Sequence, residues 1–108
     1  MTVGGSSTSA ISGTAAINQS TGLANFASSD DTIAEEIAAI EQSFANGGHA
    51  AGNFAEWTDN GNTYVLIADG HTGSLDAHGV SIGDTLIKLV GVDSSHVSFS
   101  NGNLAYHA

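Results

Sequence analysis

The sequence contains no cysteine, and only one of its 108 residues is Lys or Arg. Without cysteine the chain has neither a disulfide framework nor thiol chemistry. Eleven Asp and Glu residues against the single basic residue give a formal net charge of −10. Nucleic acids and anionic membranes are recognised mainly through Lys and Arg, so this composition argues against both as partners.

Long hydrophobic runs are absent as well. No apolar run approaches the roughly 20 residues needed to cross a bilayer, so no membrane insertion is expected. The N-terminus lacks the basic and apolar regions of a cleavable secretion signal, so export would require another route. Hydrophobic residues still make up 41% of the chain, and their periodic runs favour a folded protein over a disordered acidic one. A length of 108 residues fits one domain.

The N-terminal part of the chain has the weakest pattern. Residues 1–9, MTVGGSSTS, are small and polar, which predicts a flexible N-terminal arm. Residues 10–108 are predicted to form a single domain. Within it, residues 10–26 carry a few apolar residues around a Ser-Thr-Gly break, which favours one or two short strands at a sheet edge.

Residues 30–48, DDTIAEEIAAIEQSFANGG, predict a helix. Thr32 and Glu35 have the spacing of a capping box. The apolar stripe of this helix consists of Ile33, Ile37, Ile40 and Phe44. The acidic residues that would stabilise the positive end of the helix dipole are Asp30, Asp31, Glu35 and Glu36. Asn46, Gly47 and Gly48 supply the expected helix end.

Strand patterns follow the helix. Residues 53–58 alternate, Asp59-Asn60-Gly61 is a hairpin turn signal, and residues 62–68 resume with apolar side chains on both faces, as in a central strand. Residues 85–90 form another apolar run, and residues 97–99 and 104–106 bracket a turn. The predicted fold is α+β, with one amphipathic helix packed on a mainly antiparallel sheet of about four to five strands.

Three segments in order carry a resemblance to a known group of proteins. They are DTIAE at residues 31–35 with the alanine-rich helix after it, GNTYVLIADG at 61–70, and DTLIKLVGV at 84–92. Over residues 25–108 the sequence resembles the C-terminal domains of bacterial proteins exported by type I secretion, the repeat-in-toxin and S-layer-like group. The resemblance implies an export signal at the end of the chain, read by an ABC transporter complex, and calcium-dependent folding outside the cell. The calcium-binding nonapeptide repeat of such proteins is absent here.

Loop acids and histidines are the candidate metal ligands. Calcium takes several oxygen ligands, and Asp69, Asp76 and Asp84 border a single connection, so they are the predicted calcium residues. Turn formation explains Asp and Asn in loops equally well. The histidines His49, His71, His78, His96 and His107 form no compact zinc motif. A haem ligated by Tyr64 or Tyr106 with a histidine is a weaker alternative.

No catalytic constellation stands out. The sequence has no G-x-S-x-G elbow and no phosphate loop with a Lys. Lys88 lies within a predicted strand, where it is expected to extend its charge to solvent or pair with a carboxylate. Trp57 is expected to pack in the core or on a sheet face, with a sugar platform as the alternative.

These observations favour a non-enzymatic, secreted or cell-surface module that carries an export signal and acts as a folded cap. Its expected partner is the type I exporter. A first alternative is a structural subunit that forms homo-oligomers, a filament or a surface layer, by strand-edge addition. A second is a small module that binds a metal, haem or a sugar.

Overall fold

The computed structural model describes residues 2–3, 13–18, 21–46, 51–68, 84–100 and 103–106. Within these ranges the elements, in chain order, are β1 (Thr2–Val3), β2 (Ala16–Ile17), β3 (Ala24–Asn25), α1 (Ile33–Asn46), β4 (Asn53–Asp59), β5 (Asn62–Ile67), β6 (Thr85–Leu89), the 3-10 helix η1 (Ser94–His96), β7 (Val97–Ser100) and β8 (Asn103–Tyr106). One helix packs against mainly antiparallel sheets, so the predicted α+β class is confirmed.

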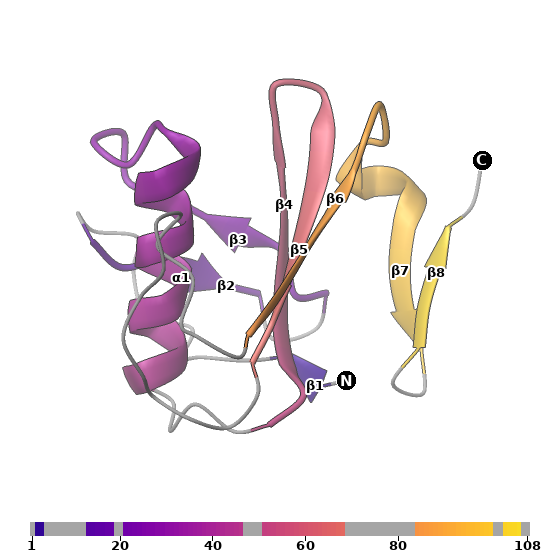
Figure 1. Ribbon diagram of the computed structural model, residues 1–108, viewed down its shortest axis with the longest axis horizontal. Coiled ribbons are helices and arrows are strands. Elements are labelled where there is room, and N and C mark those ends of the chain that lie inside the picture. Colours follow the sequence, from indigo (N-terminus) through magenta and orange to yellow (C-terminus); the bar gives the residue numbers. More distant parts are fainter. Residues whose placement is uncertain are drawn as a thin grey trace.

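The described strands divide among three sheets where one was predicted. The main sheet has the order β1-β4-β5-β6, and β2-β3 and β7-β8 form two separate pairs. All of these pairings are antiparallel except that of β1 with β4. In Figure 1 α1 lies on one side of the main sheet with β2 and β3 beside it, and the β7-β8 hairpin lies on the other side. The main sheet therefore separates two unlike layers.

The predicted N-terminal arm is partly ordered in the sheet. Thr2 and Val3 form β1 and pair in parallel with Asn53 and Phe54 of β4. These two residues therefore belong to the main sheet, contrary to the prediction of a flexible arm for this stretch. The small polar composition of residues 1–9 concealed the pairing, because backbone hydrogen bonds need no particular side chain. The rest of the arm, residues 4–9, lies outside the described residues.

Helix α1 begins as its sequence predicts. The backbone N–H of Glu35 donates to Thr32 Oγ1 at 3.2 Å, and the backbone N–H of Thr32 donates to Glu35 Oε1 at 3.3 Å. This is the reciprocal capping box. The predicted stripe faces inward, since Ile37, Ile40 and Phe44 are buried and Ile33 packs against them. The predicted glycine end of the helix, Gly47 and Gly48, lies outside the described residues.

The turn between β4 and β5 sets the register of the main sheet. Asn60 and Gly61 have φ angles of 51° and 80°, both in the left-handed region that a type I′ turn requires. Asp59 then pairs with Asn62, and the pairing runs on to Phe54 opposite Ile67. Strand β5 is flanked by β4 and β6, so its predicted central position is confirmed.

Successive residues of β4 point to opposite faces of the main sheet. On the face toward α1, Ala55 and Trp57 join the core with Ile40 and Phe44 of the helix. On the other face, Phe54 and Glu56 are buried as well. The second face is covered by the short elements η1 and β7, and a pocket lies beside Glu56 there.

Candidate functional site

The predicted calcium residues are only partly visible. Asp69 and Asp76 lie outside the described residues, and Asp84 is a partly buried residue directly before β6. Across the described ranges, no three His, Asp or Glu side chains gather in a group that could hold a metal ion. Calcium at Asp69, Asp76 and Asp84 therefore stays a prediction.

Of the five histidines, His96 is the one that the structure describes. It ends η1, and its ring centroid lies 6.2 Å from that of Tyr106, which is 65% exposed. His49, His71, His78 and His107 lie outside the described residues. The tyrosines considered for haem are separated, since Tyr64 packs against the core on the α1 side and Tyr106 ends the β7-β8 hairpin.

Trp57 is a core residue, as the sequence predicted. It is 1% exposed, stacks on Tyr64 with ring centroids 5.4 Å apart, and meets Phe26 edge to face at 6.1 Å. Both neighbours belong to the same layer between α1 and the sheet. A sugar platform needs an accessible ring face, which Trp57 does not offer.

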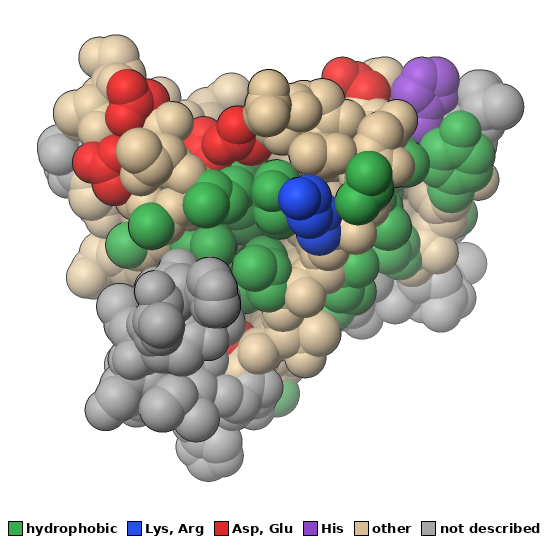
Figure 2. Space-filling model, turned by 45° about the horizontal axis from the view of Figure 1, so that its top comes forward, with side chains coloured by type: hydrophobic (Ala, Val, Ile, Leu, Met, Phe, Trp, Pro, Cys, Tyr) green, Lys and Arg blue, Asp and Glu red, His purple; other side chains and the backbone are tan. Residues whose placement is uncertain are grey.

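Lys88 lies over an aromatic ring. It lies opposite Tyr64 in the β5-β6 pairing, and its Nζ is 5.9 Å from the centre of that ring, which is cation–π geometry. Lys88 is exposed, which agrees with the predicted extension of its charge to solvent. In Figure 2 the basic side chain sits among hydrophobic side chains, and acidic side chains gather elsewhere on that face.

Glu36 is buried against β4, whereas the sequence placed it among the acids of an exposed helix start. Trp57 Nε1 donates a hydrogen bond to Glu36 Oε1 at 3.2 Å. Burial of the carboxyl, followed by its hydrogen bond and charge contact with Asp59, raises the pKa of Glu36 to about 8. Glu36 thus joins helix to sheet as a neutral carboxyl over much of the ordinary pH range.

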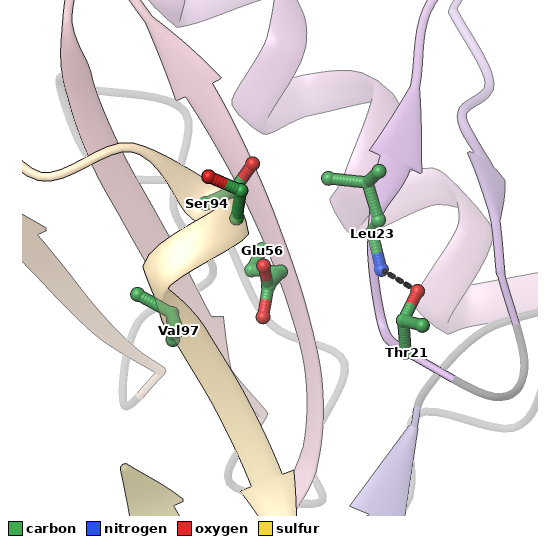
Figure 3. Close-up of a pocket in the computed structure, with 6 residues that line it drawn as sticks. Thr21, Leu23, Glu56, Ser94 and Val97 are labelled. Atoms are coloured by element: carbon green, nitrogen blue, oxygen red, sulfur yellow. Dashed lines mark hydrogen bonds between the residues drawn. The ribbon is translucent and has the colours of Figure 1, made fainter. Parts of the chain in front are cut away.

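Glu56 lies on the opposite face of β4 and lines a pocket (Figure 3). The side chain is 3% exposed, and Oε2 has no hydrogen-bond partner among the described residues. Burial alone raises the pKa of Glu56 to about 7. A buried carboxylate oxygen with no donor is rare in folded proteins, which makes this residue the leading candidate for a functional group.

The pocket is assembled by three segments. Its lining residues are Thr21, Leu23, Glu56, Ser94, Ser95 and Val97, and its volume is about 320 Å³. The 21–23 segment is held on β4 by the Glu56 N–H, which donates to the Gly22 carbonyl at 2.8 Å. On the other side the Ser94 N–H donates to Thr58 Oγ1 at 2.9 Å. One hydrogen bond to the β4 backbone and one to a β4 side chain therefore hold the two walls around the Glu56 carboxylate.

Sequence reasoning missed Glu56 as a site residue. In the alternating stretch NFAEWT it occupies a position that reads as an ordinary solvent-facing charge. The segments that surround it are distant in the chain: residues 21–23 lie more than 30 residues earlier, and η1 and β7 about 40 residues later. The available signal was an acid between Ala55 and Trp57, in a strand with apolar residues on both faces.

Comparisons with models of protein families, with curated proteins and with solved structures found no match for this chain. No helix among the described residues is long and apolar enough to span a membrane.

Proposed function

We propose that this chain is a non-enzymatic extracellular module of a type I-secreted protein, with an export signal in its last strands and a folded cap in its helix-on-sheet body. The observation that best supports this proposal is the separateness of the β7-β8 hairpin. Its strands pair only with each other among the described strands, and it lies on the side of the main sheet away from α1 (Figure 1).

An exporter that reads an extended chain needs a segment that detaches easily. Segments with few buried contacts open locally at lower free energy than the core. Four residue pairs, from Val97 with Tyr106 to Ser100 with Asn103, join the two strands of the hairpin to each other, and no described strand of the main sheet pairs with them. Detaching it leaves the main sheet and its contacts with α1 intact, which suits recognition of this segment by the ABC transporter complex.

The test is export of a passenger fused to the whole of residues 1–108. The full chain is needed because β1 belongs to the main sheet and Ile17 of β2 belongs to the core. In a strain with a matching exporter, the passenger should appear in the medium, and deletion of residues 97–106 should abolish its appearance. Retention of the full fusion, while another substrate of the same exporter is secreted, contradicts the proposal.

The edge of β6 favours self-assembly as a second candidate. Strand β6 pairs with β5 on one side and with no described strand on the other. Its residues, TLIKL, include no acid, and Val90 directly after it is 75% exposed. A strand edge that pairs with no described strand and carries a single charge, Lys88, is a template for pairing with a second copy.

Size-exclusion chromatography with and without calcium tests this second candidate. The wild-type chain should form oligomers in at least one condition, and Val90→Glu should shift it toward monomer because it adds a charge beside the edge. Ser98→Glu, at an exposed position of β7, is the matched control and should leave the oligomers in place. A wild-type chain that is monomeric with and without calcium removes this candidate.

A further inference from the structure

The pocket beside Glu56 contains one strong acceptor atom that receives no hydrogen bond from the described residues. The Glu56 carboxylate is almost fully buried, and its Oε2 receives no hydrogen bond from the described residues. An ionised carboxylate only accepts hydrogen bonds. A molecule that brings N–H or O–H donors into the pocket therefore satisfies an atom that the described chain leaves unsatisfied.

The walls favour a donor carried on an alkyl chain. Leu23 and Val97 contribute apolar side chains to the lining on opposite sides of Glu56 (Figure 3). Ser94 and Ser95 are polar lining residues. Thr21 is also a lining residue. The Leu23 N–H donates a hydrogen bond to its hydroxyl oxygen at 3.2 Å, which orients the Thr21 side chain. The volume of about 320 Å³ is at the small end for ligand pockets.

Charge narrows the ligand class further. The chain carries a formal charge of −10, and such a field concentrates cations and repels anions. Calcium is a poor fit because it takes six to eight oxygen ligands and this lining contains a single carboxylate. A primary ammonium group needs fewer acceptors, and its three N–H donors match a carboxylate with neighbouring hydroxyl oxygens.

We infer that the Glu56 pocket binds a primary alkylammonium group, with its N–H donors on the Glu56 carboxylate and its alkyl chain between Leu23 and Val97. The group is that of a small free amine or of a Lys side chain, since both have this chemistry. This binding is independent of the proposed export role. It assigns a ligand class to a site that none of the sequence patterns indicated.

Binding is linked to the protonation of Glu56. Because burial raises the pKa of this carboxyl to about 7, it is mostly neutral at pH 5 and mostly ionised at pH 8. The other lining residues, from the 21–23 segment, η1 and β7, are uncharged. Asp93 caps η1 and His96 is its last residue, and neither lines the pocket. An ammonium ligand prefers the ionised form, so its affinity should rise with pH.

The experiment is an NMR titration of the ¹⁵N-labelled full chain with n-butylammonium chloride at pH 8 and constant ionic strength. Saturable shifts are expected at the amides of residues 21–23, 56 and 94–97. The neutral isostere n-butanol tests whether the alkyl chain alone suffices, and tetramethylammonium tests charge without N–H donors. Both should bind at least tenfold more weakly. Equal binding of either compound, or no saturable shift with n-butylammonium, overturns the inference.

Two variants separate the carboxylate from general effects of buried acids. Glu56→Gln keeps the shape of the side chain and removes its charge, so affinity should fall at least tenfold. Glu36→Gln changes a buried glutamate on the other side of β4 and should leave affinity unchanged. Equal affinity in wild type and Glu56→Gln overturns the inference.

The wild-type pH profile keeps the test decisive even if Glu56→Gln folds poorly. With a pKa of about 7, roughly 1% of Glu56 is ionised at pH 5, so binding there should be about 100-fold weaker than at high pH. Affinity that does not change with pH overturns the inference.

A last pair of ligands distinguishes the two sources of the group. The peptide acetyl-Gly-Lys-Gly-amide should bind in the same pocket if a Lys side chain is the occupant, and the same peptide with acetyl-lysine should not. Tighter binding of the Lys peptide than of n-butylammonium supports a protein partner. Tighter binding of n-butylammonium supports a free amine. Binding of the acetyl-lysine peptide as tightly as the Lys peptide contradicts the ammonium requirement.

Discussion

Glu36 and Glu56 are both buried glutamates that lie against β4, but they face opposite layers of the molecule. On the α1 side, Glu36 accepts a hydrogen bond from Trp57 and contacts Asp59, within a layer filled by aromatic rings. On the η1 side, Glu56 has an oxygen without a partner among the described residues and borders a pocket. One carboxyl completes a packed layer, and the other is available to a ligand.

The difference follows from the elements that cover each face. Helix α1 presents Ile37, Ile40 and Phe44, whose bulk fills the space over β4 and β5. Helix η1 is three residues long and brings serines, which are too small to fill the same depth. The α1 layer should therefore supply most of the stability, and the η1 layer most of the capacity to bind.

The largest expected effect is on the α1 side. Ile37→Ala removes a side chain that is 1% exposed from the centre of the packed layer. It should lower the free energy of unfolding by about 2 to 5 kcal/mol, measured by urea denaturation. Ile33→Ala, at a partly buried position on the same helix, is the control and should cost less. Equal losses at the two positions would mean that this layer is not the main source of stability.

The next effect is a pH dependence centred on Glu56. Its folded-state pKa of about 7 lies above the ordinary value of 4.5, so its contribution to stability is complete below pH 4.5. As the pH rises through 7 that contribution, about 3 kcal/mol, is lost. Glu56→Gln should therefore be more stable than wild type at pH 8 and similar to it at pH 4.5, as measured by thermal or urea unfolding.

Glu36 provides the internal check on that result. The pKa of Glu36 is also raised, so the free energy of unfolding that Glu36 contributes also falls as the pH rises. That loss is complete only when the pH passes about 8. The stability of Glu56→Gln should therefore still fall with pH because Glu36 remains. The stability of Glu36→Gln should still fall with pH because Glu56 remains. Wild type and Glu56→Gln with identical profiles would contradict the burial argument for the η1 side.

A smaller effect tests how the 21–23 segment forms its wall of the pocket. Gly22 has a φ of +79°, and a Cβ there would overlap the Phe54 ring. Gly13 has a φ of +83° with nothing within 4 Å of the added Cβ. Both Ala variants strain the backbone, so Gly22→Ala should lose about 1 to 3 kcal/mol more than Gly13→Ala because of the clash alone. Equal losses in thermal unfolding would show that the segment does not press on Phe54.

The smallest effect concerns the start of α1. Thr32→Ala removes the hydroxyl that accepts from the Glu35 N–H and should cost about 1 kcal/mol. Ser29→Ala, at an exposed position before the helix, should change stability little. Urea denaturation measures both. A loss as large as that of Ile37→Ala would mean that capping matters as much as packing on the α1 side.

Features that depend on neighbours in the chain could be predicted from the sequence. The capping box at Thr32 and Glu35 and the hairpin turn at Asn60 and Gly61 were predicted from a few residues each, because each is a local backbone arrangement. The α1 stripe and the central position of β5 followed from the periodicity of apolar residues. These features determine the layer between α1 and the main sheet.

Features that depend on distant segments could not be predicted. The pairing of Thr2 and Val3 with β4 joins residues about 50 apart and uses backbone groups common to every residue. The burial of Glu56 depends on where η1 packs, and the local sequence NFAEWT does not indicate the position of η1. The predicted site at Asp69, Asp76 and Asp84 was based on acidic residues in loops, which can be identified from the sequence alone. A pocket formed by three distant segments cannot be identified in that way.

Strand β4 is the element on which all the layers converge. It pairs with β1 and β5, forms a bridge from Glu56 to Leu23, and presents side chains to α1 and to η1. Its amide hydrogens should therefore exchange with solvent only when the whole molecule opens, whereas those of β7 and β8 should exchange through local fraying. A pulling force applied at the hairpin would therefore unfold the least protected strands first. The mechanical resistance should be greatest when the force reaches β4.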